Sequence, residues 1–122
     1  AVFIALHIHA GLSGEQVGET LETTRIIDES ISIIEGYFSM RISKNSLAYA
    51  RMMSHLYYMA ARARREEPLK VDMNDYIYEK YPKAGEAAEA VCSYMGKQLK
   101  KEIQKEEIGF LAIHIQRILS EE

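Results

Sequence analysis

The sequence is poor in several features that define common protein classes. Its 122 residues contain one cysteine, two prolines and no tryptophan. The single cysteine, Cys92, excludes a disulfide within the chain and a cysteine-based zinc cage. No apolar run approaches the roughly 20 residues that cross a bilayer, and no signal-peptide pattern is present. We therefore expect no membrane association, and the low cysteine content fits a reducing, cytoplasmic compartment.

The chain also has only a small excess of one charge over the other, and it lacks common catalytic motifs. The chain has 15 Lys and Arg against 18 Asp and Glu, a net charge of −3, and its basic residues form no long block. This pattern argues against strong non-specific binding of nucleic acid. We find no Gly-Xaa-Ser-Xaa-Gly, no phosphate-binding glycine loop and no His-Glu-Xaa-Xaa-His. We expect no enzymatic activity, no cofactor and no metal site.

What the sequence does contain is helical periodicity. Hydrophobic residues make up 48% of the chain, enough for one core in a single domain. They recur at spacings of three and four residues, and no stretch shows the clean alternation of a strand. We predict an all-α domain that forms a five-helix bundle. The expected helices start at caps or breakers, namely Ser13, Ser43, Asp72, Pro82 and Glu106.

The first of these helices carries apolar residues on two faces, which predicts a central position or a subunit interface. Its main predicted stripe is Val17, Leu21, Thr24, Ile27, Ile31, Ile34 and Phe38.

A short segment occurs twice. Phe3–Ile8 (FIALHI) returns as Phe110–Ile115 (FLAIHI), with four of six residues identical and an offset of 107 (110 − 3). The two segments are either unrelated core helices or the ends of a module that occurs in tandem. In the tandem interpretation, residues 1–12 end a preceding copy, residues 13–122 form the next one, and the chain is cut from a longer protein.

Histidines at helix edges are the candidate functional residues. On a helix from about Asn45 to Arg65, His55 shares one strip with Arg51 and Arg62 at the border of the apolar face. Two guanidinium groups beside a histidine favour an added anion and keep the ring neutral near pH 7.

His114 occupies an equivalent position on the last helix, with Arg117 three residues further on. Three interpretations of the two histidines remain open at this point: acceptors of a phosphate, core residues satisfied by hydrogen bonds, or two nitrogen ligands of a metal.

Three segments together resemble a known family. Tyr49–Leu56 (YARMMSHL), Glu79–Pro82 (EKYP) and Glu107–Ile115 (EIGFLAIHI) are similar to the PTS regulation domain, or PRD, over about Val17 to Leu119. Such domains occur in tandem in bacterial transcriptional antiterminators of the BglG/LicT type and in some sugar-operon activators. The chain resembles a second PRD preceded by the end of the first.

The resemblance implies a five-helix bundle that forms homodimers. It implies phosphorylation of His55 and His114 by the sugar phosphotransferase system, with the phosphocarrier HPr or a sugar-specific enzyme II as donor. His7 matches the second histidine of the preceding copy. Arg51 matches the arginine that accompanies the first histidine, whereas Arg62 and Arg117 are assigned to phosphate support from spacing alone.

The resulting hypothesis is a charge switch. Phosphorylation adds roughly −1.5 to −2 charges and changes dimerisation, which controls RNA binding through an amino-terminal domain outside this fragment. The fragment itself is not expected to bind nucleic acid. Two alternatives stay open: a PRD from a DNA-binding activator, and a plain helical dimerisation module whose histidines are structural.

Overall fold

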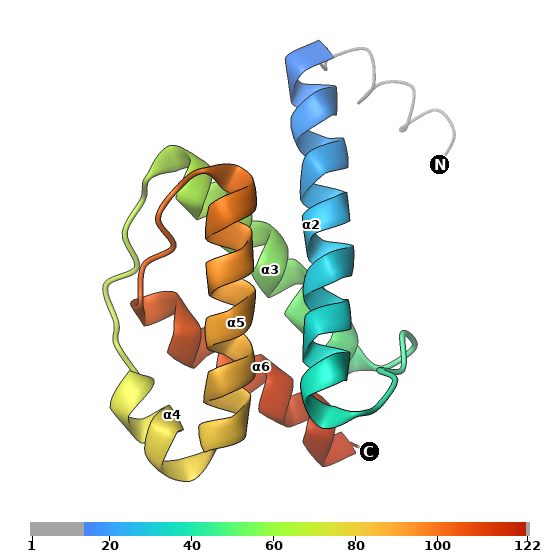
Figure 1. Ribbon diagram of the computed structural model, residues 1–122, viewed down its shortest axis with the longest axis vertical. Helices are drawn as coiled ribbons and strands as arrows, with labels where there is room; N and C mark the ends of the chain where they lie inside the picture. The colour runs from blue at the N-terminus through green and yellow to red at the C-terminus, as the bar shows by residue number, and fades with distance from the viewer. Residues whose placement is uncertain (1–13, 122) are drawn as a thin grey trace.

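The computed structural model describes residues 14–121, with side chains from residue 18 to residue 120. These residues form helices and connecting loops, and no strand occurs among them (Figure 1). The helices are α2 (Gly14–Phe38), α3 (Leu47–Arg65), α4 (Asn74–Lys80), α5 (Pro82–Leu99) and α6 (Glu106–Glu121). The predicted all-α fold of five helices is therefore confirmed for this part of the chain. The repeat at Phe3–Ile8, His7 and the expected cap at Ser13 lie outside the described residues.

Helix α5 occupies the middle of the bundle and packs against all four of the other helices. Helix α2 stands beside it, and α6 runs across the bundle between α5 and α3 (Figure 1). The core is built from aliphatic and methionine side chains that are completely shielded from solvent, among them Ile26, Met52, Leu56, Met59, Ile77, Val91, Met95, Leu111 and Ile115. None of the described helices is long and apolar enough to cross a membrane.

The buried face of α2 differs from the predicted stripe at its amino-terminal half. Leu21 is 67% exposed and Thr24 is exposed, so the prediction is wrong at these two positions. Thr23 is buried instead, and the Arg64 guanidinium on α3 donates a hydrogen bond to its hydroxyl. The buried face of α2 thus includes a polar contact to another helix, which apolar spacing alone does not reveal.

Helix α3 begins later than predicted. Its cap is Ser46, not Ser43: the Ser46 backbone is extended (φ −83°, ψ 152°) and its hydroxyl accepts a hydrogen bond from the Tyr49 N–H. The Ser46 hydroxyl in turn donates to the Ser43 carbonyl at 3.2 Å. The shift does not move His55, which lies in the middle of the helix.

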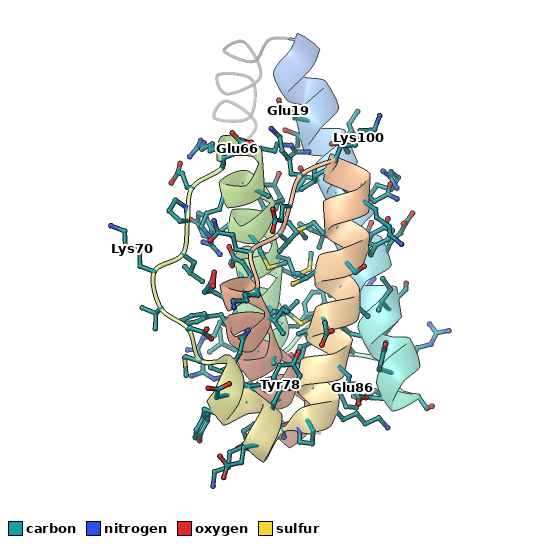
Figure 2. All side chains as sticks on the ribbon, turned by 60° about the vertical axis from the view of Figure 1, so that its left-hand side comes forward. Glu19, Glu66, Lys70, Tyr78, Glu86 and Lys100 are labelled. Carbon is teal, nitrogen blue, oxygen red and sulfur yellow. The ribbon has the colours of Figure 1, made fainter. Side chains whose placement is uncertain are left out.

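The later helices begin near their predicted starts. The Asp72 carboxylate accepts from the Asn74 N–H at 2.8 Å, just before α4, and Pro82 is the first residue of α5. Helices α3 and α5 end on Glu66 and Lys100, which both adopt the left-handed conformation and lie at the same end of the bundle (Figure 2). Neither is the glycine that usually takes this conformation.

Candidate functional site

The two predicted histidines meet at the contact between α3 and α6. The ring centroids of His55 and His114 are 4.7 Å apart, and the ring planes are inclined by 37°. Both histidines are half-buried. The structure therefore brings together two residues that are 59 positions apart (114 − 55) in the sequence.

One nitrogen of each ring is buried and lacks a hydrogen bond within the described part of the chain. His55 Nε2 and His114 Nδ1 are buried and have no hydrogen-bond partner among the described residues. Buried polar atoms in proteins are almost always hydrogen-bonded, so each exception needs an explanation. A histidine kept only for the architecture of a core normally has its ring nitrogens satisfied, which is not the situation of this pair.

Burial keeps both rings neutral. It is the main cause that lowers the pKa of His55 to about 4, and the charges of His114 and Arg62 lower it further. The pKa of His114 is lowered by burial and then by the charges of Arg117 and Arg51. Near pH 7 both imidazoles are therefore uncharged, and each has a nitrogen lone pair that can act as a nucleophile.

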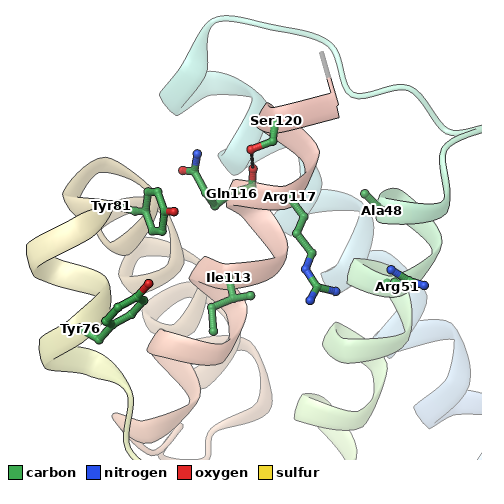
Figure 3. A pocket seen from close by; sticks show the side chains of 8 residues that line it. All are labelled: Ala48, Arg51, Tyr76, Tyr81, Ile113, Gln116, Arg117 and Ser120. Atoms are coloured by element: carbon green, nitrogen blue, oxygen red, sulfur yellow. Dashed lines mark hydrogen bonds between the residues drawn. The ribbon is translucent and has the colours of Figure 1, made fainter.

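Two arginines face a groove beside the histidine pair. The groove has a volume of about 510 Å³ and is lined by Arg51 from α3 and Arg117 from α6, and Figure 3 shows the Arg117 side chain extending from α6 toward α3. No carboxylate is found among the residues that line it, and neither arginine forms an ion pair within the described part of the chain. The lining residues are Ala48, Arg51, Tyr76, Tyr81, Ile113, Gln116, Arg117 and Ser120.

Arg62, the third predicted arginine, is directed elsewhere. Its Nε and Nη2 donate to the two carboxylate oxygens of Glu107 at 2.8 and 2.7 Å. Glu107 is only 4% exposed, and this hydrogen-bonded pairing is the main cause that raises the pKa of Arg62. The side chain is therefore already occupied, which separates Arg62 from Arg51 and Arg117.

Glu107 is the residue that the sequence interpretation overlooked. It lies with Glu106 in the first turn of α6, where carboxylates face the positive end of the helix dipole. A signal was present: Glu107 lies seven residues before His114, and Arg62 lies seven residues after His55. Spacings of seven place residues on the same face of a helix.

A metal centre has little support from the side chains. Among residues whose positions are described, no group of three or more His, Cys, Asp or Glu side chains could hold an ion. The histidine pair would supply two ligands, fewer than the three or four protein ligands of usual zinc sites.

Comparison with known proteins gives a consistent family assignment. The family model described as PRD domain matches residues 28–118. The chain is 29% identical to the PtsGHI operon antiterminator of Bacillus subtilis (strain 168) over 118 residues, which cover 95% of the chain and 42% of that protein. It is 27% identical to transcription antiterminator LicT of the same organism over 124 residues, 99% of the chain and 45% of the relative.

The beta-glucoside operon antiterminator of Dickeya chrysanthemi is 30% identical over 124 residues, 99% of the chain and 44% of that relative. The chain thus spans less than half the length of these curated relatives.

Proposed function

Because the chain belongs to the PRD domain family, we propose that it is a regulatory domain whose His55 and His114 accept a phosphoryl group. The relatives named above are antiterminators, which are regulatory proteins. We place this chain as the second PRD of such a protein, with residues 1–12 as the end of the preceding copy and His7 as that copy's remaining acceptor. The histidine pair, beside two arginines that form no ion pair with any described residue, is the observation that supports the proposal most directly.

Two features of the site support phosphoryl transfer to a histidine. Neutral imidazoles supply the nucleophile, and burial keeps them neutral. The guanidinium groups of Arg51 and Arg117 line the groove and have the planar fork that matches phosphoryl oxygens. Arg62 stays with Glu107 and is not part of the proposed phosphate contact.

The proposed step exchanges one phosphorus–nitrogen bond for another. A ring nitrogen of His55 or His114 attacks the phosphorus of a phosphohistidine on the donor protein. The donor P–N bond breaks, its imidazole leaves with the electron pair and takes up a proton, and the acceptor ring releases a proton from its other nitrogen. No oxidant or metal enters the balance. The donor of the proposal is the phosphocarrier HPr or a sugar-specific enzyme II of the phosphotransferase system.

Phosphorylation at this place changes the contact between two helices. Roughly −1.5 to −2 charges would be introduced beside rings that now lie 4.7 Å apart and partly buried. The α3–α6 contact must then rearrange around Arg51 and Arg117. We propose that this change alters a homodimer and so controls RNA binding by an effector domain of the full-length protein.

The direct test is phosphorylation with purified components. The chain is incubated with HPr, enzyme I and phosphoenolpyruvate, and the product is analysed by mass spectrometry at neutral or alkaline pH, because phosphohistidine is acid-labile. We expect phosphate on His55, His114 or both. The variants His55→Ala and His114→Ala should each lose their own site, while His9→Ala serves as the control. Absence of phosphate from both residues would sink the proposal.

The competing functions give different results in the same variants. A plain dimerisation module with structural histidines predicts that His55→Ala and His114→Ala unfold the domain or leave its regulation unchanged. Our proposal predicts folded variants with lost regulation. A PRD from a DNA-binding activator would share the phosphorylation but would act on DNA, so the effector domain of the full-length protein must be assayed with both nucleic acids.

A further inference from the structure

A second polar contact lies on the same line of the α3–α6 interface as the histidine pair. His55 and Arg62 are seven residues apart on α3, and Glu107 and His114 are seven residues apart on α6. His55 meets His114, and Arg62 meets Glu107, so the two helices run in opposite directions and both pairs obey one register. A step of seven residues forward along α3 therefore matches a step of seven residues back along α6.

This register follows from helix geometry. Seven residues rotate an α-helix to within about 20° of two full turns and advance it by about 10 Å. The ion pair and the histidine pair therefore lie on adjoining faces of the same two helices, about two turns apart. Any slip of α3 along α6 separates both pairs at once.

We propose that Arg62 and Glu107 form a positioning pair, which holds α3 and α6 in the register that makes His55 face His114. The contact between the rings does not depend on the proposed phosphorylation. Only its use, the presentation of two acceptors to one donor, rests on the proposed function.

The contact is suited to this role. Two nitrogens of the Arg62 guanidinium donate to the two carboxylate oxygens of Glu107, at 2.8 and 2.7 Å. This two-bond geometry tolerates little displacement of one helix along the other. Glu107 is 4% exposed, and the side chain of Arg62 is 23% exposed. Buried ion pairs often add little net stability compared with apolar residues of the same size, and some instead specify one arrangement.

The pair also acts on the charge around the rings. The charges that lower the pKa of His55 come from His114 and Arg62, and those that lower the pKa of His114 come from Arg117 and Arg51. Glu107 compensates the charge of Arg62 directly. Loss of the carboxylate should therefore lower the pKa of His55 further, whereas loss of the guanidinium should raise it.

These opposite directions report the charges of the pair, whereas the contact between the rings reports positioning. Separation of the rings would by itself raise both histidine pKa values toward 6.5 in either variant, so the charge effect is measured as the difference between a variant at Arg62 and a variant at Glu107. The informative variants are Glu107→Gln, which keeps the size of the side chain, and Arg62→Gln, which removes the charge and shortens the side chain. The matched control is Glu66→Gln, which removes the carboxylate of the exposed Lys101–Glu66 pair on the same side of the molecule.

The experiment is NMR of the histidine ring protons in the whole chain, with folding followed by circular dichroism at each pH. We expect the His55 midpoint to lie higher in Arg62→Gln than in Glu107→Gln, by about 1 in pH, because each variant removes one charge roughly 10 Å away and the two charges act in opposite directions. The contact between the two rings should give a cross-relaxation signal in the parent chain. The signal should weaken in both variants and persist in Glu66→Gln.

The swapped variant, Arg62→Glu with Glu107→Arg, guards against misfolding of the single variants. It restores the pair with reversed direction and should recover the ring–ring signal. The proposal is overturned if the ring–ring signal is unchanged in folded Glu107→Gln and Arg62→Gln. It is also overturned if the single variants lose the signal and a folded swapped variant does not regain it. None of these readouts needs phosphate, so failure of phosphorylation in the parent chain would count only against the proposed function.

Discussion

His55 on α3 faces His114 on α6 with 4.7 Å between the ring centroids, and each ring has one buried nitrogen without a hydrogen bond in the described structure. Neither ring can become charged in this arrangement without loss of favourable hydration. The pair is therefore a place where protonation, or the addition of a group with charge, acts on the contact between two helices.

The first prediction concerns the pH dependence of stability. The pKa of His55 is about 4 in the folded chain and 6.5 in the unfolded chain, so between these values the unfolded state binds more protons. Its contribution to the free energy of unfolding is then constant above about pH 6.5 and falls as the pH drops toward 4. From pH 7.5 to pH 5 we expect His55 to account for a loss of about 2 kcal/mol.

Urea unfolding of the parent chain and of His55→Gln at both pH values measures this loss. The glutamine variant lacks the titrating group and should show a smaller decrease, by about 2 kcal/mol. An equal decrease in parent and His55→Gln would contradict the prediction.

The second prediction concerns the two arginines at the groove. Arg51→Gln and Arg117→Gln remove donors that face the proposed phosphoryl group, so we expect each to slow phosphorylation by about tenfold. Their folding should stay intact, because neither arginine has an ion pair within the described residues. Initial rates of phosphate incorporation from phosphorylated HPr measure the effect.

Arg65→Gln is the matched control for these two variants. Arg65 also belongs to α3, its side chain is 73% exposed, and it lies at the far end of the helix from Arg51. The Arg65→Gln variant should be phosphorylated at the parental rate. If all three variants slow equally, the effect comes from net charge and donor attraction, and the assignment of Arg51 and Arg117 to the phosphate is wrong.

The sequence predicted the helices well because their apolar spacing is a local property. Helix ends were less predictable: Ser43 and Ser46 both suit a cap, and only the extended backbone at Ser46 decides between them. The face of α2 could not be obtained from spacing, since burial of Thr23 depends on Arg64 from another helix.

The same limit applies to the candidate site. A helical wheel placed His55 and His114 at the edges of their helices, and both are half-buried. It could not show that these edges meet, because the pairing of α3 with α6 is a property of the whole bundle. For that reason Arg62 and Arg51 looked equivalent beside His55, and the partner of Arg62, Glu107, became visible only with the fold.

The third prediction concerns the approach of α6 to the start of α4. The Gly109 N–H donates to the Asn74 side-chain oxygen at 2.9 Å, and a Cβ at Gly109 would lie 2.7 Å from that oxygen and 3.2 Å from the Asn74 backbone nitrogen. Gly109→Ala must push the two segments apart, and we expect it to destabilise the domain by about 2 kcal/mol. Gly36→Ala is the control, because nothing lies within 4 Å of its added Cβ.

In that control the extra methyl should stabilise α2 by about 0.5 kcal/mol, since glycine loses more backbone entropy than alanine in a helix. Chemical denaturation of both variants gives the comparison. We expect the two variants to change the free energy of unfolding in opposite directions. An unchanged free energy of unfolding in Gly109→Ala would mean that α4 moves away from α6 without cost.

The fourth prediction uses the left-handed residue at the end of α5. Lys100 has φ 55° and ψ 40°, and its N–H donates to the Gly96 carbonyl. A side chain in this conformation is strained by contact between its Cβ and the backbone, and glycine has no Cβ. Lys100→Gly should therefore raise the free energy of unfolding by about 1 kcal/mol.

Lys97→Gly, which also removes an exposed lysine of α5 but from within the helix, should lower the free energy of unfolding by about the same amount. Urea denaturation of the two variants separates the conformational effect from the loss of charge, which they share. A Lys100→Gly variant that is destabilised as much as Lys97→Gly would show that strain at this helix end does not limit stability.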